Sequence, residues 1–166
     1  FDGDGKADIA RWQPSSGEWR VKSSANAGAI TNTVLGSNGQ TIVPADYDGD
    51  GKTDHADFNP TNGNWTIKRS SDGTTQTVTG FGQSGDKTAV GDFDGDGKAD
   101  PTVYRPTDGA WYLLRSTAGF TGTQFGIAAD KIAPADFDGD GKTDIAVFRD
   151  GAWYLLRSQL GFTSVQ

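Results

Sequence analysis

A nine-residue acidic segment is the part of this sequence best suited to chemistry, because it sets aspartates at alternating positions among glycines. Its last copy runs Asp136-Phe137-Asp138-Gly139-Asp140-Gly141-Lys142-Thr143-Asp144, with carboxylates at positions 1, 3, 5 and 9. The spacing lets three carboxylates point toward one centre as the backbone curls, and Gly141 permits the sharp turn that brings the Lys142 carbonyl there. Hard oxygen donors without imidazole or thiolate favour Ca²⁺ over zinc or copper, and Mg²⁺ dehydrates too reluctantly for such a cage. The segment therefore predicts a calcium site.

The segment recurs along the chain with the same spacing. Complete copies also begin at Asp46 and Asp92, whereas the copy at the start lacks position 1 and keeps Asp2, Asp4, the Lys6 carbonyl and Asp8. Together the four copies hold 15 of the 22 acidic side chains, in a chain of net charge −7. Most of the negative charge is thus gathered where a cation would neutralise it.

Two other interpretations of these segments were weighed. An EF-hand needs a bidentate glutamate at position 12 between two helices, but position 12 here is Asp57, Val103 or Val147 in strand-like sequence. Asp-Gly runs also form ordinary polar turns. A turn has no need of four mutually repelling carboxylates, so three complete copies with one spacing favour the metal site.

The acidic segments belong to a longer repeat. Its aromatic-Asp-Gly-Asp-Gly-Lys phrase begins at Phe1, Tyr47, Phe93 and Phe137, at spacings of 46, 46 and 44 residues. Each copy is followed by an aromatic residue, a glycine-containing turn and a tryptophan: Trp19, Trp65, Trp111 and Trp153. In the third repeat we expect strands at about residues 88–91, 102–105, 110–115 and 120–125, from the two-residue period and the Asp108-Gly109 hairpin signal.

A period of 44–46 residues with four strands per unit is typical of β-propeller blades. We therefore predict an all-β fold, a β-propeller-type array of four four-stranded blades of about 45 residues, circularly shifted and lacking one inner strand. We expect one repeat domain over residues 1–166, with repeats at about 1–42, 43–87, 88–131 and 132–166, the first incomplete at its start and the last at its end. The repeated tryptophans are expected to pack between blades.

The same residues resemble a known repeat family. The Asp-x-Asp-Gly-Asp-Gly-x-x-Asp loop, with Phe81-Gly82 or Phe125-Gly126 before it and an apolar strand after it, is similar to the FG-GAP/VCBS repeat over essentially the whole chain. Such repeats form the calcium-bearing blades of integrin α-chain propellers and of many bacterial secreted proteins. The resemblance implies a β-propeller with Ca²⁺ in loops between the first and second strands of each blade, although family propellers usually have about seven blades.

Carried over by position, the resemblance implies three complete calcium sites and a partial fourth. The implied ligands are Asp46, Asp48, Asp50, the Lys52 carbonyl and Asp54; Asp92, Asp94, Asp96, the Lys98 carbonyl and Asp100; and Asp136, Asp138, Asp140, the Lys142 carbonyl and Asp144. The partial site comprises Asp2, Asp4, the Lys6 carbonyl and Asp8.

The composition narrows the class of protein. The acidic balance argues against nucleic acid as a partner, and no apolar run approaches the ~20 residues of a membrane span. The absence of cysteine excludes disulfides, thiol catalysis and Cys-based zinc sites.

An enzymatic role finds little support among the remaining residues. Glu18 and Asp57 are the only candidate pair for glycosidase chemistry, and they lie in different repeats. His55 is the sole histidine and stands where other repeats have isoleucine, which favours a packed side chain. Asp86 and Asp130 occupy equivalent positions, each before a lysine, which indicates a structural role. We therefore predict that the chain is not an enzyme.

The predicted function is that of a secreted or cell-surface calcium-binding module for adhesion, ligand binding or assembly, with a protein or a glycan as partner. Self-association through open strand edges, giving a filament or larger oligomer, is one alternative, because the array lacks a strand at one end and has a free strand at the other. A lectin-like module or an accessory domain of a secreted glycan-active enzyme is another, with the unrepeated Trp12 as a candidate for an exposed contact. Asn64-Trp65-Thr66 is an N-glycosylation sequon.

Overall fold

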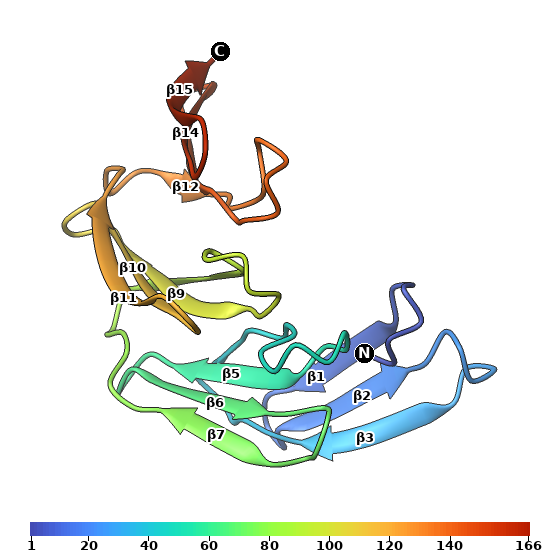
Figure 1. Cartoon of the computed structure of the whole chain (residues 1–166). Coiled ribbons are helices and arrows are strands. Elements are labelled where there is room, and N and C mark those ends of the chain that lie inside the picture. The colour runs from blue at the N-terminus through green and yellow to red at the C-terminus, as the bar shows by residue number, and fades with distance from the viewer. The chain divides into compact units, whose positions relative to one another are not determined.

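The computed structural model describes residues 1–166 and consists of strands and turns without a helix (Figure 1). The strands form four antiparallel sheets, one for each sequence repeat, and we call these sheets blades 1 to 4. Blade 1 contains β1 (Ile9–Gln13), β2 (Glu18–Lys22) and β3 (Ile30–Val34), and blade 2 contains β4 (Thr41–Ile42), β5 (His55–Asn59), β6 (Asn64–Lys68) and β7 (Thr75–Val78). Blade 3 contains β8 (Lys87–Gly91), β9 (Asp100–Arg105), β10 (Ala110–Arg115) and β11 (Gly119–Gln124), and blade 4 contains β12 (Lys131–Ile132), β13 (Ile145–Arg149), β14 (Ala152–Arg157) and β15 (Gly161–Val165).

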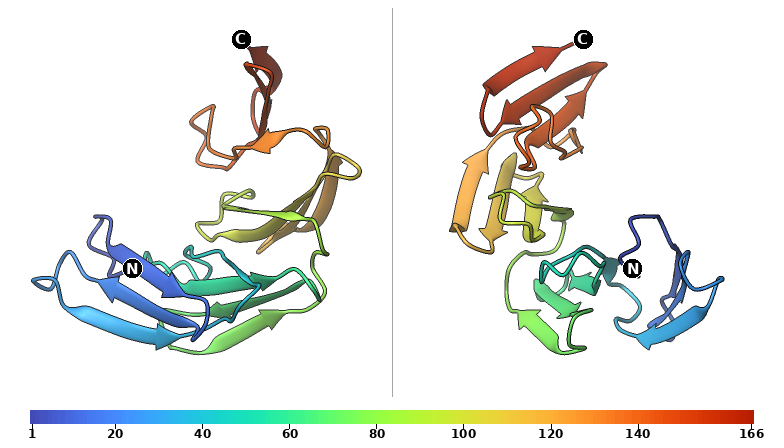
Figure 2. Two further views of the ribbon diagram at one scale, coloured as in Figure 1. Left: turned by 180° about the vertical axis from the view of Figure 1, so that it is seen from behind. Right: turned by 45° about the vertical axis from the view of Figure 1, so that its right-hand side comes forward.

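The predicted all-β blade array is confirmed. In every blade the strands pair in chain order, and the separate sheets can be followed in the two further views of Figure 2. Blade 1 has three strands and the other blades have four, so the missing inner strand is found where it was predicted. The strands of the third repeat agree with the predicted ranges to within two residues at either end.

The blades fall into two compact units, Phe1–Ser84 and Gly85–Gln166, each of which contains two blades. The core of the second unit is a cluster to which both of its blades contribute: Ala89, Phe93, Tyr104, Trp111, Leu113, Ile145 and Val147. The single repeat domain and its repeat limits stay a prediction.

In blades 2 and 3 the tryptophan and the Phe-Gly pair are linked by one hydrogen bond. The Trp111 indole N–H donates to the Phe125 carbonyl at 2.9 Å, and the Trp65 indole N–H donates to the Phe81 carbonyl at 2.8 Å. The indole is thereby buried with its only donor satisfied, which a tryptophan inside a blade requires. This bond explains why the two sequence features recur together.

In blades 2 and 3 the hairpin turn before the tryptophan lies against that same Phe-Gly segment. Gly109 has φ +63°, and a Cβ added to it would lie closer than 3.0 Å to the Gly126 carbonyl oxygen. Both the backbone conformation and the close approach therefore demand glycine at this turn.

Two repeated Asp–Arg pairs fix the ends of strands in blades 3 and 4. Asp86 receives two hydrogen bonds of 2.9 Å from Arg105, and Asp130 receives bonds of 2.6 and 2.8 Å from Arg149. Burial alone would raise the pKa of Asp130, but its hydrogen bonds from Arg149 and the Ile127 amide outweigh that effect, and the pKa lies below its usual value. These hydrogen bonds agree with the structural role expected for Asp86 and Asp130.

Asp57 in β5 breaks the pattern of the other blades. It is 1% exposed, stands where blades 3 and 4 have Val103 and Val147, and its Oδ1 accepts no hydrogen bond. Burial raises the pKa of this carboxyl to about 6. Asp57 is thus a buried charge without a partner at neutral pH.

We expect Gly109→Ala to lower the free energy of unfolding far more than Gly161→Ala. Gly161 has a similar φ of +70°, but nothing lies within 4 Å of an added Cβ. Its substitution should therefore lower the free energy of unfolding only by the backbone strain, about 1–2 kcal/mol. Gly109→Ala adds a steric clash with backbone, and the difference between the variants in urea denaturation measures that clash. Equal losses would contradict the close approach.

We expect Asp57→Asn to raise the free energy of unfolding by about 2 kcal/mol at pH 8 and to have almost no effect at pH 4. Because the folded-state pKa lies above the unfolded one, the carboxylate destabilises the fold increasingly as pH rises from about 4 to 6. Urea denaturation at both pH values, with the exposed Asp150→Asn as control, measures the effect. A pH-independent difference between Asp57→Asn and the native chain would contradict this prediction.

Candidate metal centre

Every acidic loop of blades 2, 3 and 4 lies between the first and second strands of its blade. Residues 46–54 join β4 to β5, residues 92–100 join β8 to β9, and residues 136–144 join β12 to β13. Bridges between Ala45 and Asp54 and between Ala135 and Asp144 close the base of two of these loops. Each of these loops is thus joined to a strand of the same blade at both ends.

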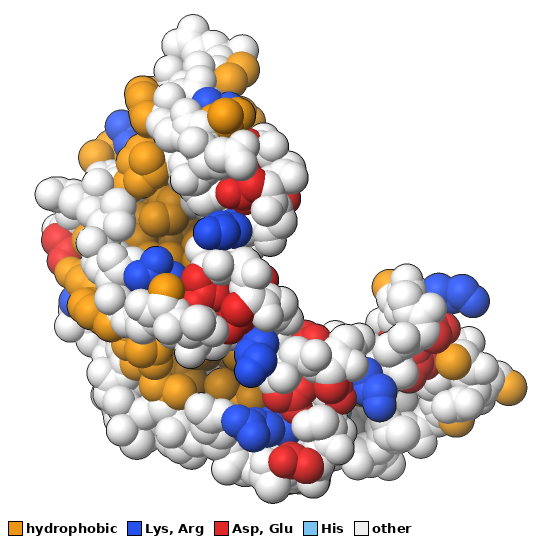
Figure 3. All heavy atoms as spheres, viewed as in Figure 1, with side chains coloured by type: hydrophobic (Ala, Val, Ile, Leu, Met, Phe, Trp, Pro, Cys, Tyr) orange, Lys and Arg blue, Asp and Glu red, His pale blue; other side chains and the backbone are white.

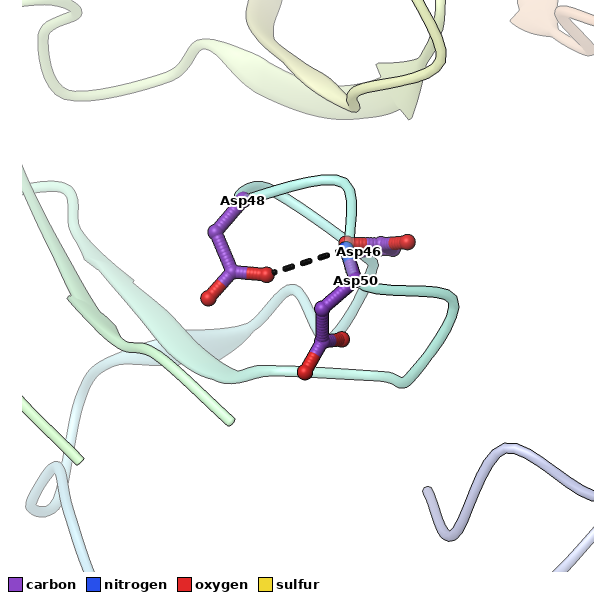
Figure 4. Close-up of side chains that lie close together, drawn as sticks. All are labelled: Asp46, Asp48 and Asp50. Carbon is purple, nitrogen blue, oxygen red and sulfur yellow. Dashed lines mark hydrogen bonds between the residues drawn. The ribbon is translucent and has the colours of Figure 1, made fainter. Parts of the chain in front are cut away.

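The loops bring carboxylates together in groups whose oxygens lie within 4.8 Å of one another. The groups are Asp46, Asp48 and Asp50 in blade 2, Asp92, Asp94 and Asp96 in blade 3, and Asp136, Asp138 and Asp144 in blade 4. Figure 4 shows the first of these groups, and Figure 3 shows acidic side chains gathered in clusters on the visible face. Asp54, Asp100 and Asp140 belong to the same loops but lie outside these groups.

The aspartate at position 1 shapes the loop around itself. Asp92 Oδ1 accepts hydrogen bonds from the amides of Gly95 at 2.6 Å and Asp96 at 3.2 Å, and Oδ2 accepts one from Gly97 at 2.8 Å. Asp46 and Asp136 repeat the bonds to both glycines. The loop backbone therefore curls here because one carboxylate accepts hydrogen bonds from the glycine amides.

The aspartate at position 9 ties the loop to the rest of the blade. Asp100 is fully buried, and its two oxygens accept hydrogen bonds from the amides of Phe93 at 2.8 Å and Ser116 at 2.7 Å. Burial raises its pKa to about 6 against these bonds, and the neighbouring Asp94 and Asp92 add to the rise. The loop thus holds negative charge in a place that disfavours it.

A serine in the turn between the last two strands completes each loop, although the sequence pattern did not identify it as part of the site. The hydroxyls of Ser70 and Ser158 donate to the position-5 carboxylates of Asp50 and Asp140 at 2.9 and 2.6 Å. Ser24 and Ser116 make the equivalent bonds to Asp4 and Asp96. The repeated Arg-Ser pairs, Arg69-Ser70, Arg115-Ser116 and Arg157-Ser158, were the available signal.

In blades 3 and 4 the aspartate at position 3 leaves an oxygen without a donor. Asp94 Oδ2 accepts a hydrogen bond from the Ala118 amide at 2.8 Å, and Asp138 Oδ2 accepts one from the Leu160 amide at 3.0 Å. The Oδ1 atoms of both residues are shielded from solvent and accept none. A buried anionic oxygen among other carboxylates needs a cation, so these residues fit a hard metal ion.

The remaining predicted ligands are the carbonyls of the lysines at position 7. The Lys98 and Lys142 amides donate to Asp96 and Asp140 at 3.0 and 2.8 Å, which places the position-7 residue in the loop. The roles of the Lys6, Lys52, Lys98 and Lys142 carbonyls as ligands stay predictions.

The first loop differs from the other three and forms no such carboxylate group. Asp8 accepts hydrogen bonds from the amides of Asp2 at 3.0 Å and Ser24 at 2.7 Å, and the Phe1 amine lies 2.8 Å from it. The bond from this amine, followed by that from Ser24, holds the pKa of Asp8 well below its usual range. The carboxylates of this loop are therefore satisfied largely by the protein itself.

Glu18 and Asp57, the pair considered for glycosidase chemistry, lie in different sheets. Glu18 in β2 pairs with Arg20 at 3.2 Å, whereas Asp57 is buried in a different sheet. The His55 ring packs edge-on against Trp19 at 5.1 Å, and burial lowers its pKa to about 4, so it is a neutral packed histidine.

The tryptophans correct two expectations. Trp12, expected at the surface, is half-buried and donates its indole N–H to the Leu35 carbonyl at 3.0 Å, as Trp19 also does. Trp19, Trp65 and Trp111 are buried as predicted, but Trp153 is 38% exposed.

Four small antiparallel sheets, three of which have an acidic loop between their first two strands, define an array of β-propeller-type blades. Comparison with protein families agrees, since an FG-GAP-like repeat matches residues 1–56 and an FG-GAP repeat matches residues 128–152. The chain thus contains FG-GAP repeats, and the predicted repeat family is confirmed. Members of this family are generally structural or binding units. A comparison with curated protein sequences finds no match. No helix with the length and apolarity needed to cross a bilayer is present.

We expect Ser158→Ala to loosen the loop of blade 4 without unfolding the blade. The Ser158 amide bond to Asp144 is kept, and only the hydroxyl bond to Asp140 is lost. Amide hydrogen exchange should therefore become faster at residues 138–142 and stay unchanged in β13 and β14. Ser164→Ala, on the exposed edge strand β15, is the matched control. Unchanged exchange in the loop would show that the serine does not hold it.

Proposed function

We propose that the chain is a non-enzymatic binding module whose blades are stabilised by Ca²⁺ and which works outside the cell in adhesion, ligand binding or assembly. The observation that carries the proposal is the pair of buried oxygens, Asp94 Oδ1 and Asp138 Oδ1, which no donor satisfies. Both belong to carboxylate groups built only of hard oxygen donors. Such a donor set suits Ca²⁺.

The proposed sites comprise the position-1, -3, -5 and -9 carboxylates with the position-7 carbonyl in blades 2, 3 and 4, and a partial site in blade 1. A bound Ca²⁺ would supply positive charge and no further chemistry. The residues of the chain do the rest: the hairpin serines and amides orient the carboxylates, and the glycines expose the amides that position 1 collects.

The extracellular location and the partner are parts of the same proposal. FG-GAP repeats are typically extracellular. Extracellular calcium modules bind with Kd of about 10⁻⁴–10⁻³ M, which suits calcium outside cells. A chain without cysteine cannot use disulfides to stabilise small sheets, and a metal in each blade would serve that purpose. A protein or glycan ligand is the class of partner that we propose; the lectin alternative loses its best residue, because Trp12 is bonded within blade 1.

The metal proposal predicts a change of sign for Asp138→Asn. In excess chelator the variant removes an unpartnered charge, so its melting temperature should equal or exceed that of the native chain. In millimolar Ca²⁺ it removes a ligand, so its melting temperature should fall below that of the native chain. Thermal unfolding in both buffers measures this difference.

Asp150→Asn, an exposed turn residue of the same blade, is the control and should behave as the native chain in both buffers. Calcium titration by calorimetry should show one site fewer in Asp138→Asn. A native chain that melts at one temperature in chelator and in calcium would overturn the proposal.

A further inference from the structure

One face of blade 4 is left bare although its counterparts are covered. Trp153 occupies the position of Trp19, Trp65 and Trp111, which are 1%, 0% and 0% exposed, yet it is 38% exposed itself. It lies 6.0 Å from the Phe137 ring and 5.3 Å from the Phe148 ring, with Val165 opposite it in β15. Phe137 and Val165 are exposed as well, at 38% and 54%. We call this set the Trp153 face.

The second unit shows what covers such a face. Trp111 and Leu113 of blade 3 are buried in one cluster with Ile145 and Val147 of blade 4. The first unit repeats the arrangement, because the His55 ring of blade 2 sits against Trp19 of blade 1 at 5.1 Å. His55 and Ile145 are equivalent positions, directly after the acidic loop. The tryptophan faces of blades 1 and 3 thus each receive the first residue of the second strand of the other blade in the same unit.

Blade 1 carries the matching residues, and they too are bare. Ile9 is equivalent to His55 and Ile145 and is 74% exposed, and Ile30, paired with Lys22 as Phe162 is with Leu156, is 63% exposed. Arg11, Arg20 and Lys22 lie beside them around a shallow hollow. We call these five residues the Ile9 face. Arginine is a fitting neighbour for aromatic rings, as Arg105 over Tyr112 at 4.5 Å shows within blade 3.

The acidic loops supply a second matched pair. The Lys52 side chain lies across Gly3, and the Lys142 side chain lies across Gly95, each at 3.0 Å from the Cβ that the glycine lacks. Lys6 of blade 1 and Gly139 of blade 4 hold the equivalent positions, and nothing lies within 4 Å of a Cβ at Gly139. Blade 4 therefore leaves both kinds of contact between blades unfilled, at Trp153 and at Gly139, and blade 1 carries the matching residues Ile9 and Lys6.

We propose that the Trp153 face binds the Ile9 face of a second copy of this chain. The occupant is a second copy because the chain itself carries both halves of the contact, with Ile9 set to meet Trp153 and Lys6 set to meet Gly139. The contact joins sheet faces and does not require strand exchange, and it does not rest on the proposed calcium role. Because it is head-to-tail, it builds a closed ring or a longer series of copies.

Cross-linking between separate chains tests the pairing directly, since the native chain has no cysteine. Chains carrying only Ile9→Cys are mixed with chains carrying only Trp153→Cys and treated with a short bismaleimide. We expect a cross-linked heterodimer, and mass spectrometry should find residues 9 and 153 joined. Ile127→Cys, on an equally exposed loop residue of the second unit, replaces Trp153→Cys as control and should give none.

Sedimentation velocity from micromolar to millimolar chain measures the association itself. We expect Trp153→Glu and Ile9→Glu each to weaken it by about tenfold or more, because each puts a charge into an apolar contact, and Ile127→Glu to leave it unchanged. A native chain that stays monomeric at every concentration would overturn the proposal. So would a chain with both cysteines that cross-links only within itself, since that would make the first and last blades of one chain the partners.

Discussion

Mutual repulsion among aspartates is the constraint on which this structure depends. Each complete loop holds four carboxylates, which accept hydrogen bonds from backbone amides. Glycine amides inside the loop donate to position 1, and amides of the turn between the last two strands donate to positions 3 and 9. Position 9 is the most demanding, because Asp100 is fully buried. The loop and the last hairpin are therefore held as one piece, although they are about twenty residues apart in sequence.

Much of the fold followed from the sequence because its signals were repeated. The two-residue period, the hairpin turns and the recurring acidic phrase gave the strands of the third repeat to within two residues and placed each loop between the correct pair of strands. The three strands of blade 1 also followed, because the residues of the first repeat begin within its acidic loop. Repetition turned weak local preferences into a reliable pattern.

The sequence could not predict side-chain contacts between segments of a blade that lie far apart along the chain. The hairpin serines bond to aspartates about twenty residues away, and nothing in the Arg-Ser pair alone announces that distance. Trp12 looked exceptional because it stands where other repeats have Phe or Tyr, but its indole shares the Leu35 carbonyl with Trp19. Asp57 resembles a catalytic candidate in sequence, and only its burial beside Gly36 identifies it as an unpartnered core residue.

The segment Ala-Trp-Tyr-Leu-Leu-Arg forms both β10 and β14, letter for letter. Six identical side chains thus give Trp111 full burial in one blade and leave Trp153 open in the next. During folding, either segment could occupy the central position of either blade with no loss of side-chain complementarity. Correct assignment must therefore come from the neighbouring strands and from the lengths of the turns, and exchange of these two strands is the folding error that their identity favours.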